Sequence, residues 1–160
     1  MFNNYLKSKP VNNTVGIFTE VDIPKNKPVI EITGNLYNKD DKPEDSNNYL
    51  QVSQTWYIGL SGGLDDIIRH SCNPNCYLRV VGKRALLYSL YPIRANSELT
   101  FDYSTTSTET IEEWSMPCNC ESYNCRKLIS GFQTLDIKTQ EDYKKKGMVP
   151  SFIVNPIFIG

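Results

Sequence analysis

Three cysteines stand close together in the last third of this 160-residue chain, in the pattern Cys118-x-Cys120-x4-Cys125. Three closely spaced thiolates supply three of the four ligands that a structural zinc ion needs. A disulfide between Cys118 and Cys120 would be geometrically awkward at that separation. The flanking residues hold no other cysteine or histidine, so the fold must bring a distant part of the chain to this segment. The candidates for the fourth ligand are His70, Cys72 and Cys76.

The segment Arg69–Cys76 holds the only histidine of the chain and two of its five cysteines. Pro74 lacks a backbone donor and biases Asn73 away from the α region. Asparagines favour turns because their side chains bond to the nearby backbone. The segment therefore predicts a rigid polar loop that carries a thiol and an imidazole.

Composition excludes several classes of protein. A length of 160 residues supports one domain, and 39% hydrophobic residues with ten tyrosines suffice for a packed core. A net charge of -1 argues against a broad basic surface, so no direct nucleic-acid binding is expected. No apolar run approaches the length of a membrane span, and residues 1–7 lack the pattern of a signal peptide. We expect an intracellular protein, cytoplasmic or nuclear, whose odd number of cysteines fits metal binding.

Short runs of β-branched and aromatic residues between glycine and proline breakers favour strands over helices. These runs lie at residues 15–21, 29–32, 49–52, 55–58, 77–81 and 84–90. The turn Gly82-Lys83 joins the last two into a hairpin. One helix is predicted at about Thr139 to Lys146, opened by Asp136 or Thr139 and closed by Gly147. The pattern is that of a mainly β domain with a short C-terminal helix.

Residues 98–103 alternate between polar and apolar side chains. Leu99, Phe101 and Tyr103 share one face, while Glu98, Thr100 and Asp102 share the other. A half-buried strand is therefore expected, followed by a polar loop or linker over residues 104–113. The apolar residues 152–159 are expected to pack on the domain or to mediate self-association, and the oligomeric state is not predicted.

Three stretches, in this order, resemble the signatures of SET-domain protein-lysine methyltransferases with a post-SET zinc segment. They are Arg69-His70-Ser71-Cys72-Asn73-Pro74-Asn75, Glu98–Tyr103 and Cys118-x-Cys120-x4-Cys125. Val15-Gly16-Ile17-Phe18 is more loosely similar to the N-terminal Gly-x-Gly motif, so the resemblance covers roughly residues 11–132. It implies a fold of several small β-sheets with a C-terminal pseudoknot. The implied parts are a SET domain at 11–104, a post-SET zinc segment at 114–132 and a C-terminal extension at 133–160, with no pre-SET cluster.

The resemblance also implies a function: transfer of methyl groups from S-adenosylmethionine to the side-chain amine of a lysine in a histone tail or another protein. Tyr103 would be the catalytic tyrosine, and Tyr49, Phe101 and Tyr57 would line the lysine channel. The implied cofactor contacts are Val15, Gly16, Ile17, Phe18, Arg69, His70, Tyr103 and, over the adenine, Leu128 or Ile129. One structural zinc would be held by Cys72, Cys118, Cys120 and Cys125, which leaves Cys76 as a core thiol.

The physical chemistry of methyl transfer agrees with these roles. Aromatic walls attract an ammonium and exclude water, and a tyrosine hydroxyl can orient an amine by hydrogen bonding. No acid–base dyad is needed, so His70 is expected to fix its loop rather than to transfer a proton. Phe101 stands at the position that in this family decides the methylation state, and phenylalanine there implies di- or trimethylation.

The chain departs from the family pattern at two positions beside the expected cofactor site. Thr14 replaces the first glycine of Gly-x-Gly, and Arg69 replaces the asparagine that precedes the histidine. Asp66 replaces a common arginine, so an Asp66–Arg69 pair would be a compensating exchange. These departures leave two alternatives: an inactive SET-like module that binds a protein partner, or a zinc-stapled structural domain without a ligand.

Overall fold

The computed structural model describes residues 4–155, which form five small β-sheets, short 3-10 helices and two α-helices. The strands are β1 (Leu6–Val11), β2 (Thr14–Thr19), β3 (Pro28–Ile32), β4 (Leu36–Asn38), β5 (Leu50–Gln51), β6 (Trp56–Ile58), β7 (Arg69–His70), β8 (Cys76–Val81), β9 (Arg84–Ser89), β10 (Thr100–Phe101), β11 (Met116–Pro117) and β12 (Leu128–Ile129). The helices are η1 (Lys39–Asp41), η2 (Leu64–Ile67), η3 (Tyr103–Thr106), η4 (Phe132–Thr134), α1 (Ile137–Lys145) and α2 (Ser151–Val154). This architecture confirms the prediction of a mainly β fold of several small sheets.

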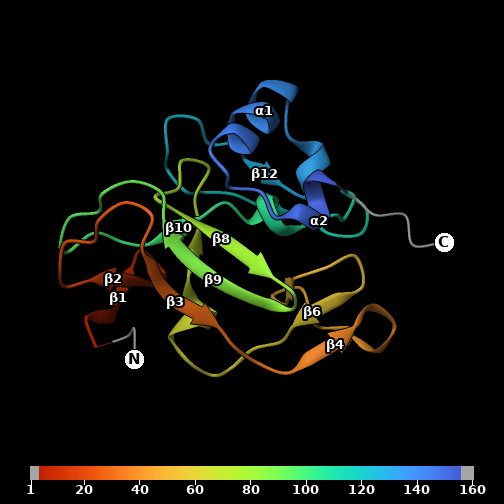
Figure 1. Cartoon of the computed structure of the whole chain (residues 1–160), viewed down its shortest axis with the longest axis horizontal. Helices are drawn as coiled ribbons and strands as arrows, with labels where there is room; N and C mark the ends of the chain where they lie inside the picture. The colour runs from red at the N-terminus through yellow and green to blue at the C-terminus, as the bar shows by residue number, and fades with distance from the viewer. Residues whose placement is uncertain (1–3, 156–160) are drawn as a thin grey trace.

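The predicted hairpin forms the middle of the molecule. Strands β8 and β9 pair antiparallel, and β3 adds to the other side of β9, in the order β3-β9-β8 (Figure 1). Gly82 has a φ of 61° in the turn between β8 and β9, a conformation that glycine adopts without strain. The C-terminal helices α1 and α2 lie on one side of this sheet in Figure 1.

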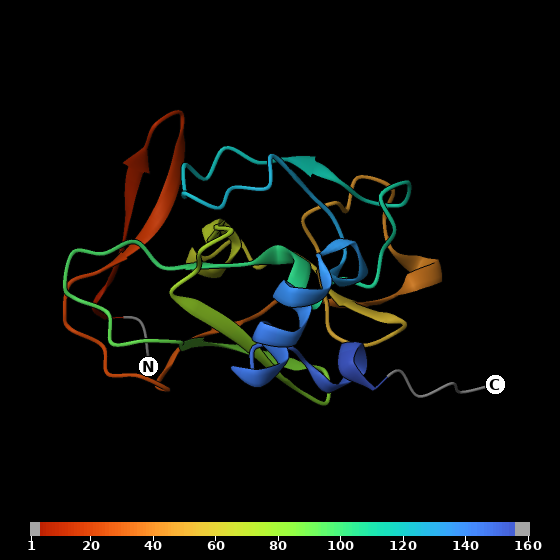
Figure 2. The same ribbon diagram turned by 90° about the horizontal axis from the view of Figure 1, so that it is seen from above.

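Two further sheets flank the central one (Figure 1). The sheet β4-β6-β5 lies at one end of the molecule, and the hairpin of β1 and β2 stands out at the other end, as Figure 2 shows from above. The sequence did not predict β1, because its polar, proline-containing stretch Lys-Ser-Lys-Pro lacks the composition of a strand. β1 lies at an edge, where Pro10 has no need to donate to a further neighbour.

The segments around His70 and Tyr103 lie together, as the predicted pseudoknot requires. β7 pairs parallel with β10, so that Phe101 lies beside His70. The Ser71 amide donates to the Phe101 carbonyl at 3.1 Å and extends this pairing toward the loop.

The strand predicted for residues 98–103 is wrong in its length and in one of its faces. β10 ends at Phe101, because the Asp102 carboxylate accepts the Ser104 amide at 3.0 Å and caps η3. Tyr103 therefore begins a helical turn rather than continuing the strand. Asp102, expected on a polar outer face, is only 1% exposed.

The segment that follows, expected to be a polar loop or linker, is buried at residues 104–107. Its hydroxyl groups find partners inside the protein, which makes this burial possible. Ser104 donates to the Ser130 carbonyl at 2.6 Å, and Thr105 donates to the Asp102 carbonyl at 2.7 Å. The sequence pattern missed this because short polar side chains look alike in a solvated loop and in a satisfied interior.

The prediction of a C-terminal helix is confirmed in α1. Asp136 caps it by accepting the Thr139 amide at 3.0 Å, and Gly147 follows it with a φ of 70°. In α2, Ile153 is buried and the Phe152 carbonyl accepts a bond from Gln54, so the described part of the apolar tail packs on the domain. Residues 156–159, on which self-association was also predicted, lie outside the described part. Within residues 4–155, every helix is too short or too polar to cross a membrane.

Buried side chains form three clusters. The largest fills the centre between the sheets and includes Ile17, Leu87 and Leu99. Cys76 is fully buried in it, which confirms its prediction as a core thiol. A second cluster, built on Phe132, joins α1 and α2 to the domain, and a third gathers around Cys72, Cys118 and Ile129.

Candidate functional site

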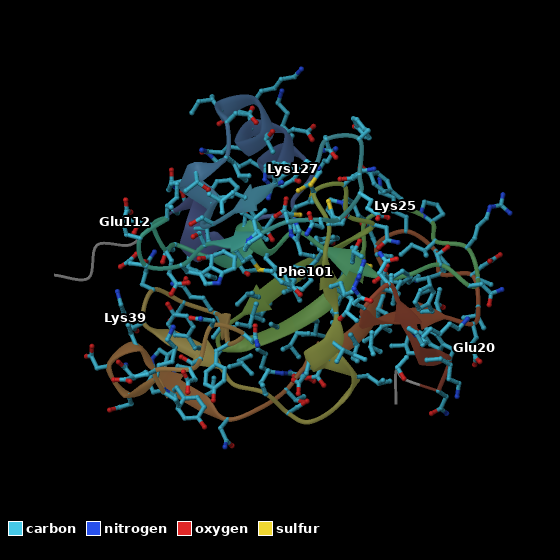
Figure 3. The ribbon with its side chains drawn as sticks, turned by 180° about the vertical axis from the view of Figure 1, so that it is seen from behind. Glu20, Lys25, Lys39, Phe101, Glu112 and Lys127 are labelled. Carbon is cyan, nitrogen blue, oxygen red and sulfur yellow. The ribbon has the colours of Figure 1, made fainter. Side chains whose placement is uncertain are left out.

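A cavity of about 130 Å³ opens beside β10 and has an aromatic wall. Tyr49, Phe101 and Tyr103 line it, as the sequence predicted for a lysine channel, together with Trp114. The ring centroids of Phe101 and Tyr103 are 4.9 Å apart. Phe101 lies near the centre of the molecule in Figure 3, seen from behind. Such a wall suits a cation, because aromatic faces attract positive charge.

Tyr103 is held at both of its polar ends. Its amide donates to Nδ1 of His70 at 3.1 Å, and its hydroxyl donates to the Ile68 carbonyl at 2.6 Å. Burial raises the pKa of Tyr103 to about 12, so the phenol keeps its proton at neutral pH. The proton is committed to Ile68, which leaves the oxygen lone pairs free to accept a bond from an amine in the cavity.

Gly59 allows two tyrosine rings to approach each other at the cavity edge. The rings of Tyr37 and Tyr49 have centroids 5.3 Å apart. A Cβ at Gly59 would lie 2.8 Å from the Tyr37 ring and 3.3 Å from the Tyr49 ring. A side chain at this position would therefore displace the aromatic edge.

Tyr57, also predicted for the channel, does not line this cavity. Its neighbour Ile58 does, and successive residues of a strand point to opposite faces. The Tyr57 ring is buried, with the Lys42 ammonium 4.2 Å from its centroid. Tyr57 is therefore not among the residues that line this cavity, and its role in a channel stays a prediction.

Two of the residues predicted for the cofactor, Gly16 and Arg69, lie beside Glu98. The Arg69 Nε donates to the Glu98 carboxylate at 2.8 Å, and a Cβ at Gly16 would collide with the same carboxylate. The absence of a side chain at Gly16 thus leaves room for the Glu98 carboxylate. The expected Asp66–Arg69 pair is wrong, because Asp66 instead accepts the amides of Ser61 and Gly62.

The remaining predicted cofactor residues differ in exposure. On β2, Val15 is exposed, Phe18 is half-buried and Ile17 is fully buried in the main core. On β12, Leu128 is exposed, whereas Ile129 is buried against the cysteine cluster. Ile17 and Ile129 therefore offer no side-chain surface to a ligand, and Leu128 remains the candidate for covering the adenine.

Three of the four predicted zinc cysteines, Cys72, Cys118 and Cys120, lie close together although they come from distant parts of the chain. The sulfur atoms of Cys72 and Cys118 are 3.8 Å apart. A tetrahedral site with Zn–S bonds of about 2.3 Å separates its sulfurs by about 3.8 Å. The thiols of Cys72, Cys118 and Cys120 and the His70 imidazole lie within 4.8 Å of one another, so the donor set fits zinc. Sulfur atoms gather near Lys127 in Figure 3.

Hydrogen bonding disqualifies His70 as the fourth ligand. Nδ1 accepts the Tyr103 amide, so in the neutral imidazole the proton resides on Nε2. Burial lowers the pKa of His70 to about 4, which keeps the ring neutral. Nε2 lies 3.2 Å from the Cys72 sulfur, where it can donate its proton to that sulfur. If Nε2 instead bound a metal, the proton would move to Nδ1, where it would clash with the proton of the Tyr103 amide.

Cys125 is the remaining candidate for the fourth ligand. It belongs to the same cluster, with its sulfur 3.5 Å from the Cys118 carbonyl, although it is not in the compact group of four donors.

The pKa of Cys120 falls to about 6, because hydrogen bonds from Ser122 and the Cys72 amide outweigh the effect of burial. A thiol that ionises readily is a good metal ligand.

Sequence reasoning missed Asp102 as a site residue. Its buried carboxylate accepts two bonds from Arg126, at 2.7 and 2.8 Å, and one from the Tyr143 hydroxyl at 2.8 Å. The only signal in the sequence was its place directly before Tyr103. The partners lie 24 and 41 residues away, so no local pattern predicts them.

Three acidic residues, Asp65, Asp66 and Glu109, are among those that line the aromatic cavity. Asp65 is held by the Thr33 amide at 2.8 Å, and Glu109 is 3.6 Å from the Lys42 ammonium. Fixed carboxylates beside the cavity favour a positively charged ligand.

Comparison with known proteins identifies the family. The family model of the SET domain matches residues 14–104, which is more than half of the chain. The chain belongs to the SET-domain family. The match includes the loop around His70, the strand β10 and Tyr103 of this SET domain.

Similar curated proteins are much longer than this SET domain. Histone-lysine N-methyltransferase SETD1 of Drosophila melanogaster is 41% identical over 73 residues, which are 43% of this chain and 4% of that protein. Histone-lysine N-methyltransferase trr of the same species is 29% identical over 80% of this chain and 6% of its own length. The H3 lysine-4 specific enzyme of Eremothecium gossypii is 37% identical over 53% of this chain and 9% of its length. The chain spans less than a tenth of each relative.

Solved structures share the fold. KRYPTONITE in complex with mCHH DNA, H3(1-15) peptide and SAH superposes with a TM-score of 0.63 at 22% identity, over 78% of this chain and 29% of that one. A second KRYPTONITE complex, with mCHG DNA and SAH, gives a TM-score of 0.62 at 24% identity, over 74% of this chain and 27% of that one. The predicted SET fold is thereby confirmed.

Proposed function

We propose that this SET domain is a protein-lysine N-methyltransferase that uses S-adenosylmethionine. The observation that carries the proposal is the Tyr103 hydroxyl, which lines an aromatic cavity with its proton committed to Ile68. Relatives named histone-lysine N-methyltransferases and structural neighbours that contain SAH support it. A histone tail is the proposed substrate, and the acidic residues that line the cavity support a basic peptide.

S-adenosylmethionine, when bound, supplies a methyl group on a positively charged sulfur. The neutral lysine amine would be the acceptor of this methyl group, and the sulfur would leave as a neutral thioether. Phe101 and Tyr49 attract the lysine as a cation, and they exclude water from the nitrogen once its proton has passed to the solvent. The Tyr103 oxygen accepts an N–H and aims the nitrogen lone pair at the carbon.

Arg69 and Glu98 form the charged part of the proposed cofactor site. The guanidinium nitrogens of Arg69 beyond the bond to Glu98 would pair with the carboxylate of the cofactor. The Glu98 carboxylate offsets the charge of Arg69, which would otherwise repel the cofactor's ammonium. This pair thus accounts for an arginine where the family has asparagine.

The zinc has a structural role in this proposal. Cys72, Cys118, Cys120 and Cys125 would hold one ion with no open position, which excludes a role for it in the chemical step. It would join the post-SET segment, residues 114–132, to the loop of the SET domain, residues 11–104. Residues 133–160 would form the C-terminal extension, and we place the protein in the cytoplasm or the nucleus.

The proposal is tested by calorimetry of the zinc-loaded protein with S-adenosylmethionine, followed by methylation of histone-tail peptides with labelled cofactor. We expect binding and transfer, and we expect Tyr103→Phe to bind the cofactor while losing at least about 100-fold in kcat. Absence of cofactor binding, with retained binding of a peptide, would instead identify an inactive SET-like module. Arg69, which stands where the family has asparagine, is the reason to test this alternative.

A further inference from the structure

The carboxylate of Asp102 joins three segments that are distant in the sequence. Arg126, next to the zinc cysteine Cys125, donates two bonds to it. Tyr143, on helix α1 of the C-terminal extension, donates one bond at 2.8 Å. The Ser104 amide donates another from η3. The Asp102 side chain is fully buried, so these protein groups replace water entirely.

The direction of the backbone at Tyr103 depends on this carboxylate. Asp102 caps η3, and this cap turns the chain out of β10 at the residue before Tyr103. The ring of Tyr103 then packs 4.9 Å from Phe101 and 5.3 Å from His70, measured between centroids. A displacement of Asp102 would therefore move the proposed catalytic hydroxyl, and small displacements of a reacting group are costly to rate.

Tyr143 is well placed to hold Asp102 still. Its ring is only 6% exposed and packs with Phe132 and Met148, which fixes its rotamer. Its hydroxyl has one proton, and Asp102 at 2.8 Å is closer than the Cys72 carbonyl at 3.4 Å. The hydrogen bond from Tyr143 to Asp102 therefore links α1 to the residue before Tyr103. The same hydroxyl also lies near the Cys72 carbonyl in the cysteine loop.

We propose that Tyr143 is a positioning residue for methyl transfer, which acts on Tyr103 through Asp102 and makes helix α1 part of the catalytic unit. This inference rests on the proposed function. It gives the C-terminal extension a role in the reaction that its sequence does not reveal. The relevant contact joins positions 41 residues apart.

The test compares Tyr143→Phe with Tyr77→Phe in the full chain loaded with zinc. Tyr77 packs against the same apolar cluster and serves as the matched control. In Tyr143→Phe, kcat for a histone-tail peptide should fall about tenfold while KM stays within about twofold and the zinc content is unchanged. Tyr77→Phe should leave kcat unchanged. In an Asp102→Ala background, Tyr143→Phe should cause no further loss, because the acceptor of the Tyr143 bond is already absent.

A second measurement separates this inference from the proposed function. Amide hydrogen exchange at residues 103–107 should be faster in Tyr143→Phe than in the wild type or in Tyr77→Phe. An inactive wild-type protein with this exchange difference would refute the methyltransferase and leave the link between α1 and Tyr103 standing. Unchanged exchange, or a lower melting temperature with an unchanged kcat, would refute the positioning role.

Discussion

The fourth zinc ligand gives the sharpest prediction, because two residues compete for it. We expect Cys125→Ser to remove a ligand and His70→Gln to leave all four ligands in place. The reason is the proton on Nε2 of His70, which the bond from the Tyr103 amide to Nδ1 requires. In this arrangement His70 donates to the Cys72 sulfur at 3.2 Å, which is shorter than the nitrogen–sulfur edge of about 3.6 Å in a tetrahedral zinc site.

The two changes should have overlapping effects on zinc affinity. Structural zinc sites contribute about 10–16 kcal/mol at neutral pH, so one ligand of four corresponds to about 3 kcal/mol, or about 100-fold in affinity. Loss of the His70 donor removes a partner outside the ligand set, which costs about 10- to 100-fold. Affinity alone separates these values poorly, whereas the number of bound sulfurs separates them completely.

The assay replaces zinc by cobalt and records the visible and near-ultraviolet absorption. The wild type and His70→Gln should both show the sulfur-to-cobalt band of a four-thiolate site, and Cys125→Ser should show a weaker band. Cys76→Ser is the control for loss of a buried thiol, since Cys76 lies in the main core and not in the cysteine cluster. A three-thiolate spectrum in the wild type that Cys125→Ser leaves unaltered would refute the reasoning.

Three further changes probe the cavity. Phe101→Tyr should shift the product from di- or trimethyllysine toward monomethyllysine, read by mass spectrometry, and an identical product distribution would contradict the role of Phe101. Asp66→Asn should raise KM about two- to fivefold for peptides with a basic neighbour of the target lysine, with kcat unchanged and the effect lost at high salt. Gly59→Ala should raise the peptide KM without changing cofactor affinity by calorimetry, because its Cβ would push the Tyr37 and Tyr49 rings apart.

Local sequence signals predicted the elements that depend on local physics. The hairpin of β8 and β9 follows from two β-branched runs and the Gly82 turn, and α1 follows from Asp136 and Gly147 at its ends. The cysteine pattern likewise predicted that residues near 72 and 118 must meet, because a zinc ion needs four ligands.

The failures share a different cause. The alternation of polar and apolar residues placed Asp102 on the outer face of a strand, because this pattern assigns a residue to a face from its position in the sequence alone. Its actual environment is set by Arg126 and Tyr143, which reach it only after the domain has folded. Tyr57 illustrates a related point: an aromatic residue fits a channel wall by type, but the pairing of β6 with β5 decides which face its ring takes. Residues with long-range partners therefore escape sequence patterns even when the fold is recognised.

The cysteine cluster around Cys72, Cys118 and Ile129 buries few side chains, so residues 114–131 need other interactions to stay ordered. Only three residues of that cluster, Cys72, Cys118 and Ile129, are buried, and β11 and β12 are two residues long each. Burial of so few side chains contributes only a few kcal/mol, about 1.5–3 for each large apolar group. That is too little to offset the conformational entropy of ordering residues 114–131, at about 1–2 kcal/mol per residue. Metal ligation at Cys118 would supply the difference together with the paired bonds from Arg126 to Asp102, and both would attach the segment at points adjoining Tyr103. Zinc removal should therefore release this segment, seen as protease cleavage near Tyr123, which is 90% exposed, while the core around Leu87 stays folded.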